Sequence, residues 1–230
     1  MHGCLLYYIT DRTAFASDEP TRCRRLLEKV KEAARAGVDY IQLRERNLST
    51  RELECLAREA VHIVREATNL APAPRPLAPV LLINSRTDVA LATGADGVHL
   101  RSDDVSPQTV RTVWRASGAG TAARVSPQPP LIGVSCHSPR EVAQAAEAMA
   151  SFAIFGPVFE KKDAPGTKPA GLVQLREACN AKIPVLALGG VALENARECL
   201  EAGAAGIAAI RLFQENEMGK VVDALRLLDR

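Results

Sequence analysis

Short apolar runs recur along the chain, and the longer stretches between them place apolar residues at helical spacing. Runs that are short and apolar throughout are typical of parallel strands buried on both faces. The predicted strands are Leu5–Ile9, Tyr40–Leu43, Val80–Ile83, Gly97–Leu100, Leu131–Ser135, Phe152–Phe155, Pro184–Leu188 and Ile207–Ile210.

The stretches between the runs predict helices. Leu26, Val30 and Ala34 repeat at helical spacing in the first stretch, and Ser138 followed by Glu141 is the pattern of a capping box at the start of the fifth. The predicted helices are Thr21–Ala36, Thr50–Thr68, Arg86–Thr93, Ser106–Ala116, Ser138–Ala150, Gly171–Asn180, Leu193–Ala202 and Glu215–Leu228.

An internal repeat connects helices to strands. Segments 36–43, 93–100 and 202–210 each follow a helical pattern, contain a glycine and lead into an apolar run. A helix that stops at glycine before a buried strand, repeated along a chain, indicates parallel strands joined by crossover helices.

Eight strand–helix pairs in 230 residues predict an α/β protein with a single TIM (β/α)₈ barrel, which forms one domain over residues 1–230. An open doubly wound sheet is the alternative, although it usually has fewer strands and a recognisable switch point. Two segments rich in proline, glycine and alanine, 71–79 and 117–130, lead from a helix into the next strand, and we interpret them as spacers.

Composition narrows the functional classes. Hydrophobic residues make up 47% and charged residues 24%, which is typical of a soluble globular protein. A net charge of +2 and 4% aromatic residues predict no nucleic-acid partner. The absence of an eighteen-residue apolar run predicts no membrane span, and the first residues lack a signal-peptide pattern, so we expect a cytoplasmic protein. The six cysteines lack metal-type spacing and are expected to be reduced thiols.

Polar residues collect after the predicted strands, where a barrel carries its chemistry. The candidate ligand-binding residues are Gln42, Arg44, Arg46, Asn84, Ser135, Gly189, Gly190 and Arg211. Gln42, Arg44 and Arg46 have the charge-assisted and forked donors that bind anions. The alternative for Arg44, Glu45 and Arg46 is a structural ring of ion pairs at the barrel rim.

A phosphate site is predicted where the seventh and eighth strands end. Gly189 and Gly190 let backbone N–H groups approach phosphate oxygens, and a helix N-terminus adds its positive end. The alternative is a tight turn without a ligand. Arg211 either closes this cup as a cation or is a surface arginine that begins a helix. The residues therefore predict a small ligand that carries phosphate.

His137 is the candidate catalytic residue, because it follows a strand and its ordinary pKa suits proton transfer near neutral pH. The alternative is a histidine that caps the following helix. His99 is expected to be a packed barrel residue. Cys136 is not expected to be a nucleophile, because adjacent residues at a strand end point in different directions.

These residues resemble one known family in order and over almost the whole chain. The matching segments are 6–11, 42–46, 83–84, 88–92, 94–100, 133–138, 155–159 and 188–191, and together they resemble the thiamine-phosphate synthase/TenI family. The resemblance implies a TIM barrel of thiamin biosynthesis with one of two activities. Synthases join hydroxymethylpyrimidine diphosphate to thiazole phosphate, whereas TenI-type tautomerases isomerise a carboxythiazole phosphate.

Departures from the synthase pattern favour the tautomerase branch. Ser85 stands where the synthase has a magnesium-binding aspartate, although Asp104 keeps the second metal position. Because pyrophosphate departure needs Mg²⁺ held by carboxylates, losing one ligand weakens that site. A tautomerase needs only a bound phosphate and a proton shuttle, and His137 resembles the acid–base histidine of that branch. The synthase's sixth-loop lysine has no clear equivalent among Lys161 and Lys162.

The resemblance therefore implies a leading function and two alternatives. The leading function is a thiazole tautomerase that binds a phosphorylated thiazole, requires no cofactor and transfers the proton through His137. The first alternative is a synthase in which Asp104 binds Mg²⁺ and the pyrimidine diphosphate is held by Gln42, Arg44, Arg46, Asn84 and Ser135. The second is a non-catalytic regulator that binds a thiamin precursor. The resemblance is also compatible with a homodimer, and the length and glycines of the loop 156–169 permit a lid, although the sequence does not show whether this loop closes over the site.

Overall fold

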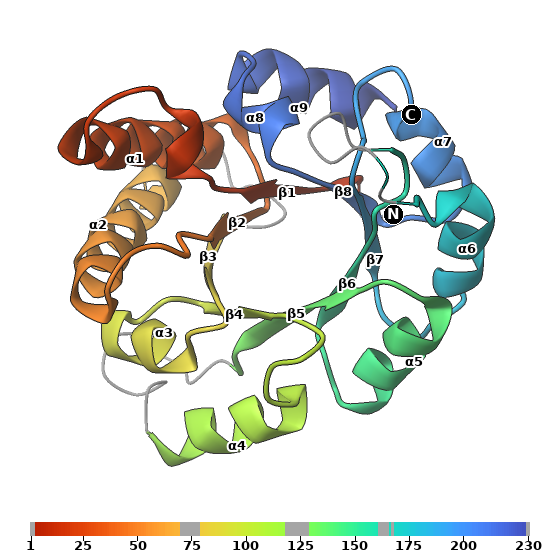
Figure 1. Ribbon diagram of the computed structural model, residues 1–230, viewed down its shortest axis with the longest axis horizontal. Coiled ribbons are helices and arrows are strands. Elements are labelled where there is room, and N and C mark those ends of the chain that lie inside the picture. The colour runs from red at the N-terminus through yellow and green to blue at the C-terminus, as the bar shows by residue number, and fades with distance from the viewer. Residues whose placement is uncertain (1–2, 70–78, 118–128, 161–165, 167, 229–230) are drawn as a thin grey trace.

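Eight parallel strands form a closed barrel in sequence order, with helices around its outside (Figure 1). The computed structural model describes residues 3–69, 79–117, 129–160, 166 and 168–228. The strands are β1 Leu5–Ile9, β2 Tyr40–Leu43, β3 Val80–Asn84, β4 Gly97–Leu100, β5 Leu131–Cys136, β6 Phe152–Phe155, β7 Val185–Leu188 and β8 Gly206–Ala209. Strand β1 pairs with β8, so the ring is closed. The prediction of a single TIM barrel is confirmed, and the open sheet is excluded.

The helices follow the strands as the pattern predicted, with differences at their ends. They are η1 Arg12–Ala14, α1 Glu19–Ala36, α2 Thr50–Asn69, α3 Thr87–Thr93, α4 Pro107–Ala116, α5 Pro139–Glu147, α6 Gly171–Ala178, α7 Ala196–Glu201, α8 Arg211–Gln214 and α9 Met218–Leu227. The short helix η1 was not predicted, because a helix of one turn has no periodicity to detect, and α8 was anticipated only in the alternative that Arg211 begins a helix. The two spacers fall largely outside the described residues, which exclude 70–78 and 118–128.

Local caps explain where several helices begin. Asp18, Ser106 and Ser138 each accept a hydrogen bond from a backbone N–H in the first turn of α1, α4 and α5. The capping box predicted at Ser138 is present in part: its Oγ accepts from the Glu141 N–H at 3.3 Å, but the Glu141 carboxylate accepts from the Ser138 hydroxyl at 3.2 Å and from the His137 N–H at 2.7 Å, not from the Ser138 N–H. These caps fix each helix immediately after a loop at one end of the barrel.

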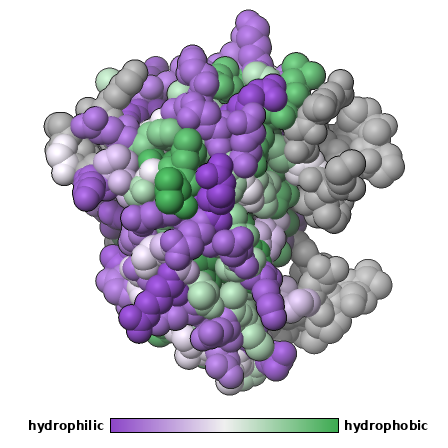
Figure 2. Space-filling view, turned by 90° about the vertical axis from the view of Figure 1, so that its right-hand side faces the viewer, coloured by the Kyte–Doolittle hydropathy of each residue, from purple (hydrophilic) through white to green (hydrophobic). Residues whose placement is uncertain are grey.

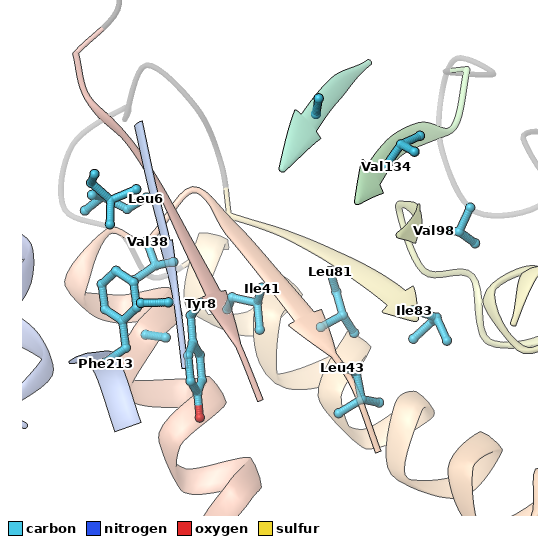
Figure 3. Close-up of a cluster of buried hydrophobic side chains, with 14 of the residues drawn as sticks. Leu6, Tyr8, Val38, Ile41, Leu43, Leu81, Ile83, Val98, Val134 and Phe213 are labelled. Atoms are coloured by element: carbon cyan, nitrogen blue, oxygen red, sulfur yellow. The ribbon is translucent and has the colours of Figure 1, made fainter. Parts of the chain in front are cut away.

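Alternate residues of each strand pack into two separate cores. Along β1, Leu6 and Tyr8 point outward to the helices, while Leu5, Tyr7 and Ile9 point into the barrel. Figure 3 shows part of the outer core, where side chains of the first strands pack with residues of the helix layer such as Phe213. Tyr8 and Phe213 meet edge to face with ring centroids 6.1 Å apart. The outer core attaches helices to strands, and the inner core fills the barrel.

Three aromatic side chains, which we call the aromatic plug, fill the part of the barrel interior away from the carboxyl ends of the strands. They are Tyr7, Tyr40 and Phe152. Phe152 stacks on Tyr40 at 5.0 Å between ring centroids and meets the edge of Tyr7 at 5.6 Å. Gly133 makes room for this packing, because a Cβ there would lie 2.5 Å from the Phe152 ring and 2.9 Å from His99 Nδ1. The aromatic plug fills the barrel on the side of His99 that faces away from the carboxyl ends of the strands. Polar side chains that could bind a ligand therefore lie at the carboxyl ends.

The described residues on one face of the molecule are mostly polar. Figure 2 shows the side covered by α6 and α7 in Figure 1, where hydrophilic side chains surround a few hydrophobic groups. Within the part of the chain that the structure describes, no helix is long and apolar enough to cross a membrane.

Candidate active site

A cavity of about 800 Å³ lies at the carboxyl ends of the strands. It brings together nine of the residues that the sequence singled out, from five different strand ends. These are Gln42, Arg44, Arg46, Asn84, Ser135, His137, Gly189, Gly190 and Arg211. Asp104 is not among the lining residues, although its neighbours Arg101, Ser102 and Asp103 are.

A chain of hydrogen bonds crosses the ends of β2, β3 and β4. Gln42 Nε2 donates to Asn84 Oδ1 at 2.8 Å, and Asn84 Nδ2 donates to Ser85 Oγ at 3.1 Å. The Ser85 hydroxyl then donates to Asp104 Oδ2 at 2.6 Å. This direction fixes the Gln42 amide, and its buried Oε1 has no partner among the described residues. A ligand that brings an N–H or O–H group would satisfy this acceptor.

The residues around Asp104 do not fit a magnesium site. The Asp104 carboxylate already accepts from Ser85 and, at 2.8 Å, from the Arg101 N–H, and the Arg101 Nε lies 3.6 Å away. Mg²⁺ is usually bound by one or two carboxylates together with waters and substrate phosphates, and here Ser85 and Arg101 already occupy the one carboxylate. No group of three His, Cys, Asp or Glu side chains in the described part of the chain could hold a metal ion. The donor set around Asp104 is that of a hydrogen-bonded carboxylate next to an arginine.

Two arginines face the cavity from the end of β2. The half-buried Arg44 guanidinium has no hydrogen bond or ion pair with any described residue, and the pKa of Arg44 is lowered by burial and by the nearby charge of Arg46. An unneutralised cation in this position favours an anionic ligand.

Glu45, between them, faces the other way. It accepts from the Thr10 hydroxyl at 2.6 Å and pairs with the buried Arg12 at 3.1 Å. Arg12 also pairs with Glu19. The predicted alternative of an ion-pair ring through Arg44, Glu45 and Arg46 is therefore wrong, because side chains alternate sides and Glu45 bonds behind the strand.

The opposite side of the cavity, after β7 and β8, exposes the backbone of two glycines beside side chains such as Leu188, Arg211 and Glu215. Gly189 and Gly190 have φ of 93° and 67°, a region that favours glycine. A Cβ at Gly190 would lie 2.6 Å from the Glu160 carbonyl oxygen. The N–H groups of both glycines have no acceptor among the described residues, as a phosphate cup requires. Arg211 begins α8, is exposed and lines the cavity, which confirms the surface helix start, whereas its role as a cation that closes the cup stays a prediction.

His137 is held with one ring nitrogen toward the protein. Its Nδ1 lies 2.6 Å from the Gly156 carbonyl oxygen, which only accepts, so Nδ1 carries the proton. In the neutral ring Nε2 is then the acceptor. The capping alternative is wrong, because Ser138 caps α5 and the His137 backbone N–H donates to Glu141 at 2.7 Å.

The expectations for His99 and Cys136 are confirmed. His99 is buried, and burial together with the Arg44 charge lowers its pKa to about 3. Cys136 belongs to the outer core, and burial raises the pKa of its thiol to about 12, which keeps it from acting as a nucleophile.

The sequence analysis missed three residues near the site, and some residues that it named lie outside the described part of the chain. Tyr7, Arg12 and Arg101 were not singled out: Tyr7 and Arg12 sit in ordinary apolar or loop contexts, whereas the polar run after the fourth strand was a usable signal for Arg101. The loop 156–169, which could form a lid, contains the lysines Lys161 and Lys162, and its residues 161–165 and 167 lie outside the described residues.

Comparison with known proteins agrees on one family. A family model described as thiamine monophosphate synthase matches residues 6–213. The thiamine-phosphate synthase of Clostridium novyi is 35% identical over 216 residues, which cover 92% of this chain and 91% of that protein. The synthase of Pyrococcus horikoshii is 35% identical over 213 residues, which cover 92% and 87%. The solved thiamine phosphate pyrophosphorylase of Pyrococcus furiosus superposes with a TM-score of 0.74 at 30% identity, covering 97% of this chain and 94% of that one.

Proposed function

The chain belongs to the thiamine monophosphate synthase family, and from this premise we propose that it is a thiazole tautomerase that moves a proton on a thiazole phosphate bound in the barrel mouth. The family is one of enzymes in thiamin biosynthesis. The proposal concerns which reaction of that chemistry this cavity performs. A cytoplasmic location, which rests on the sequence, and a homodimer, which rests on the resemblance to the family, are parts of the same proposal.

The orientation of His137 is the observation that carries the proposal. With Nδ1–H held by the Gly156 carbonyl, Nε2 of the neutral ring accepts a proton from one atom of the substrate and returns it to another. One bond to hydrogen is broken and another is formed while the double bonds of the substrate shift to match, and no group leaves. The reaction therefore needs no metal to neutralise a leaving group.

Binding is assigned to the two sides of the cavity. The N–H groups of Gly189 and Gly190 would hold the phosphate, with Arg211 at the cup edge. Arg44 and Arg46 would hold a second anionic group of the substrate, such as a ring carboxylate. Gln42, Asn84 and Ser135 would contact the polar atoms of the ring.

The second candidate is the synthase reaction, and the names of the relatives favour it. The relatives compared above are called thiamine-phosphate synthase or pyrophosphorylase, and none is called a tautomerase. The pyrimidine diphosphate would then lie on the arginines of the β2 end with Ser135 and Asn84. The donor set around Asp104, which does not fit Mg²⁺, is the observation against this reaction.

Two assays on the same preparation separate the candidates. The first follows isomerisation of the carboxythiazole phosphate in EDTA, and the second follows thiamin phosphate formation from both substrates with Mg²⁺. We expect isomerisation that EDTA does not reduce, and a loss of about 10²- to 10⁴-fold in turnover for His137→Ala. His62→Ala is the matched control, because His62 is an exposed histidine of α2 paired with Glu66.

Other outcomes assign the protein differently. Rapid Mg²⁺-dependent coupling without isomerisation would make it a synthase. Tight thiazole phosphate binding with neither reaction would make it a regulator, the third reading of the sequence. Full isomerisation by His137→Ala would remove the histidine from the mechanism.

A further inference from the structure

A buried hydrogen-bond relay connects the aromatic plug to the cavity wall. Tyr7 Oη lies 3.0 Å from His99 Nδ1, and His99 Nε2 lies 2.8 Å from Ser135 Oγ. Tyr7 belongs to β1, His99 to β4 and Ser135 to β5, so the relay crosses the barrel interior. Only Ser135 reaches partial exposure, and it lines the cavity.

Whether each group of the relay donates or accepts a hydrogen bond depends on which His99 nitrogen carries the proton. The His99 ring is neutral, because burial and the Arg44 charge lower its pKa to about 3. A neutral imidazole donates from one nitrogen and accepts at the other. The relay therefore has two arrangements, in which all the protons point either toward the cavity or toward Tyr7.

The buried end of the relay decides between them. Tyr7 is fully buried, and His99 is its hydrogen-bond partner among the described residues. If His99 Nδ1 carried the proton, the Tyr7 hydroxyl proton would have no acceptor, which disfavours that arrangement by roughly ten- to hundredfold. The Ser135 hydroxyl loses nothing in either arrangement, because it reaches the cavity.

We propose that Tyr7 and His99 are positioning residues that fix the Ser135 hydroxyl as a donor aimed at the bound substrate. Tyr7 O–H donates to Nδ1, Nε2–H donates to Ser135 Oγ, and the Ser135 proton is left for an acceptor oxygen or nitrogen of the ligand. The neighbouring chain that ends at Gln42 fixes an acceptor in the same wall, at Gln42 Oε1. Ligands that reverse this polarity would bind weakly.

The surrounding contacts keep the relay in place. A Cβ at position 133 would lie 2.9 Å from His99 Nδ1, so Gly133 leaves the space that His99 occupies. The Tyr7 ring packs against Tyr40 and Phe152 at 5.9 Å and 5.6 Å between centroids. Removing the Tyr7 hydroxyl alone would leave this packing intact.

The protonated nitrogen of His99 is directly measurable. We would label the histidines with ¹⁵N, record long-range ¹H–¹⁵N correlations of the imidazoles, and assign His99 from a His99→Gln variant. The relay predicts a neutral ring protonated at Nε2, with no change between about pH 6 and about pH 8. A ring protonated at Nδ1, or a cationic ring, would overturn the proposal.

Tyr7→Phe and Tyr40→Phe form a matched pair. Both remove one hydroxyl from the same aromatic cluster, but no hydrogen bond joins Tyr40 to another described residue. We expect the Nδ1 signal of His99 to move in Tyr7→Phe and to stay in Tyr40→Phe. Equal movement in both variants would show that the signal reports packing and would overturn the relay.

A double-mutant cycle tests the effect on the substrate. The proposal here rests on the proposed function, since Ser135 must touch the substrate. We expect Tyr7→Phe to lower kcat/KM about tenfold when Ser135 is present and less than about twofold in a Ser135→Ala background. Equal losses in both backgrounds would assign Tyr7 a structural role only. The NMR measurement needs no substrate, so a failure of the proposed function is distinguishable from a failure of the relay.

Discussion

The two sides of the cavity are built from different parts of the chain. On the side of β2 to β5, side chains do the contacting, and two hydrogen-bond networks fix the direction of Gln42 and Ser135. On the side of β7 and β8, the cavity meets glycine and alanine backbone together with side chains such as Leu188, Arg211 and Glu215, and Gly190 has a left-handed conformation. A wall of side chains changes its chemistry with one substitution, whereas a backbone wall changes only with the path of the chain.

This difference separates recognition from anchoring. Phosphate is the common part of the candidate substrates, and backbone N–H groups bind it without reading the rest of the molecule. The remaining part of the substrate would meet the side-chain wall, where one departure from the synthase pattern, Ser85, also lies. Ser85, in particular, donates to the carboxylate of Asp104 instead of adding a second one.

Gly190→Ala should break the backbone wall. The new Cβ would lie 2.6 Å from the Glu160 carbonyl oxygen in a conformation with φ of 67°, so the turn must move. We expect the KM for thiazole phosphate to rise about hundredfold, and stability to fall by about 1–3 kcal/mol. Steady-state kinetics and urea unfolding measure the two effects.

Gly219→Ala is the matched control, because a Cβ there meets nothing within 4 Å and the residue lies in α9. It should leave KM unchanged and add up to about 1 kcal/mol of helix stability. An unchanged KM in Gly190→Ala would mean that the backbone wall does not hold the phosphate.

Ser85→Asp would turn part of the side-chain wall into a metal site. Its carboxylate would face that of Asp104, whose Oδ2 lies 2.6 Å from the present Ser85 Oγ. Without metal, this repulsion should lower the free energy of unfolding by about 2 kcal/mol, and Mg²⁺ should restore most of it.

Thermal unfolding with and without Mg²⁺ provides the measurement. Ser85→Asn is the neutral control of the same shape, and Asn also tolerates the φ of 59° at this position. If Mg²⁺ stabilised the wild type as much as Ser85→Asp, the interpretation of Asp104 as a hydrogen-bonded carboxylate would be wrong.

The pH dependence of stability tests whether His99, which lies in the side-chain wall, is a buried neutral ring. The pKa of His99 is about 3 in the folded chain, against about 6.5 in an unfolded one. The unfolded state therefore binds more protons between these values, and His99 makes stability fall as the pH drops from about 6.5 toward 3, by up to about 1.4 kcal/mol per pH unit.

Urea unfolding as a function of pH isolates this contribution. His99→Gln should flatten the slope in that window, while His62→Gln should keep it. A wild-type slope that His99→Gln leaves unchanged would mean that His99 is not a buried neutral ring.

The strands were predictable from the sequence almost residue by residue. Short apolar runs with glycines beside them leave few choices for where a strand begins and ends. The strands β1, β2, β4 and β6 occur at the predicted bounds. The strand count and the length of the chain then implied the closed barrel, and the barrel implied which residues share one end. That is why the predicted site residues, apart from Asp104, line one cavity.

The connections within the site could not be predicted. Tyr7, His99 and Ser135 lie far apart in the sequence, and their contact depends on the stagger between strands, which the apolar pattern does not encode. The ion pair of Glu45 could not be predicted for a similar reason, because its partner Arg12 belongs to a one-turn helix without periodicity. Side-chain direction follows from alternation, but the choice of partner requires the three-dimensional arrangement.

Closure of the barrel has a consequence for the synthesis of the protein. Leu5 pairs with Gly206, so the first strand waits for the last one before the ring is complete. Until β8 has left the ribosome, the nascent chain carries two unpaired strand edges made of apolar residues. Contacts between such distant residues form slowly, and a chain cut short before Gly206 keeps both edges open to other chains. The pairing of β8 with β1 is therefore the folding step that protects the newly made protein from aggregation.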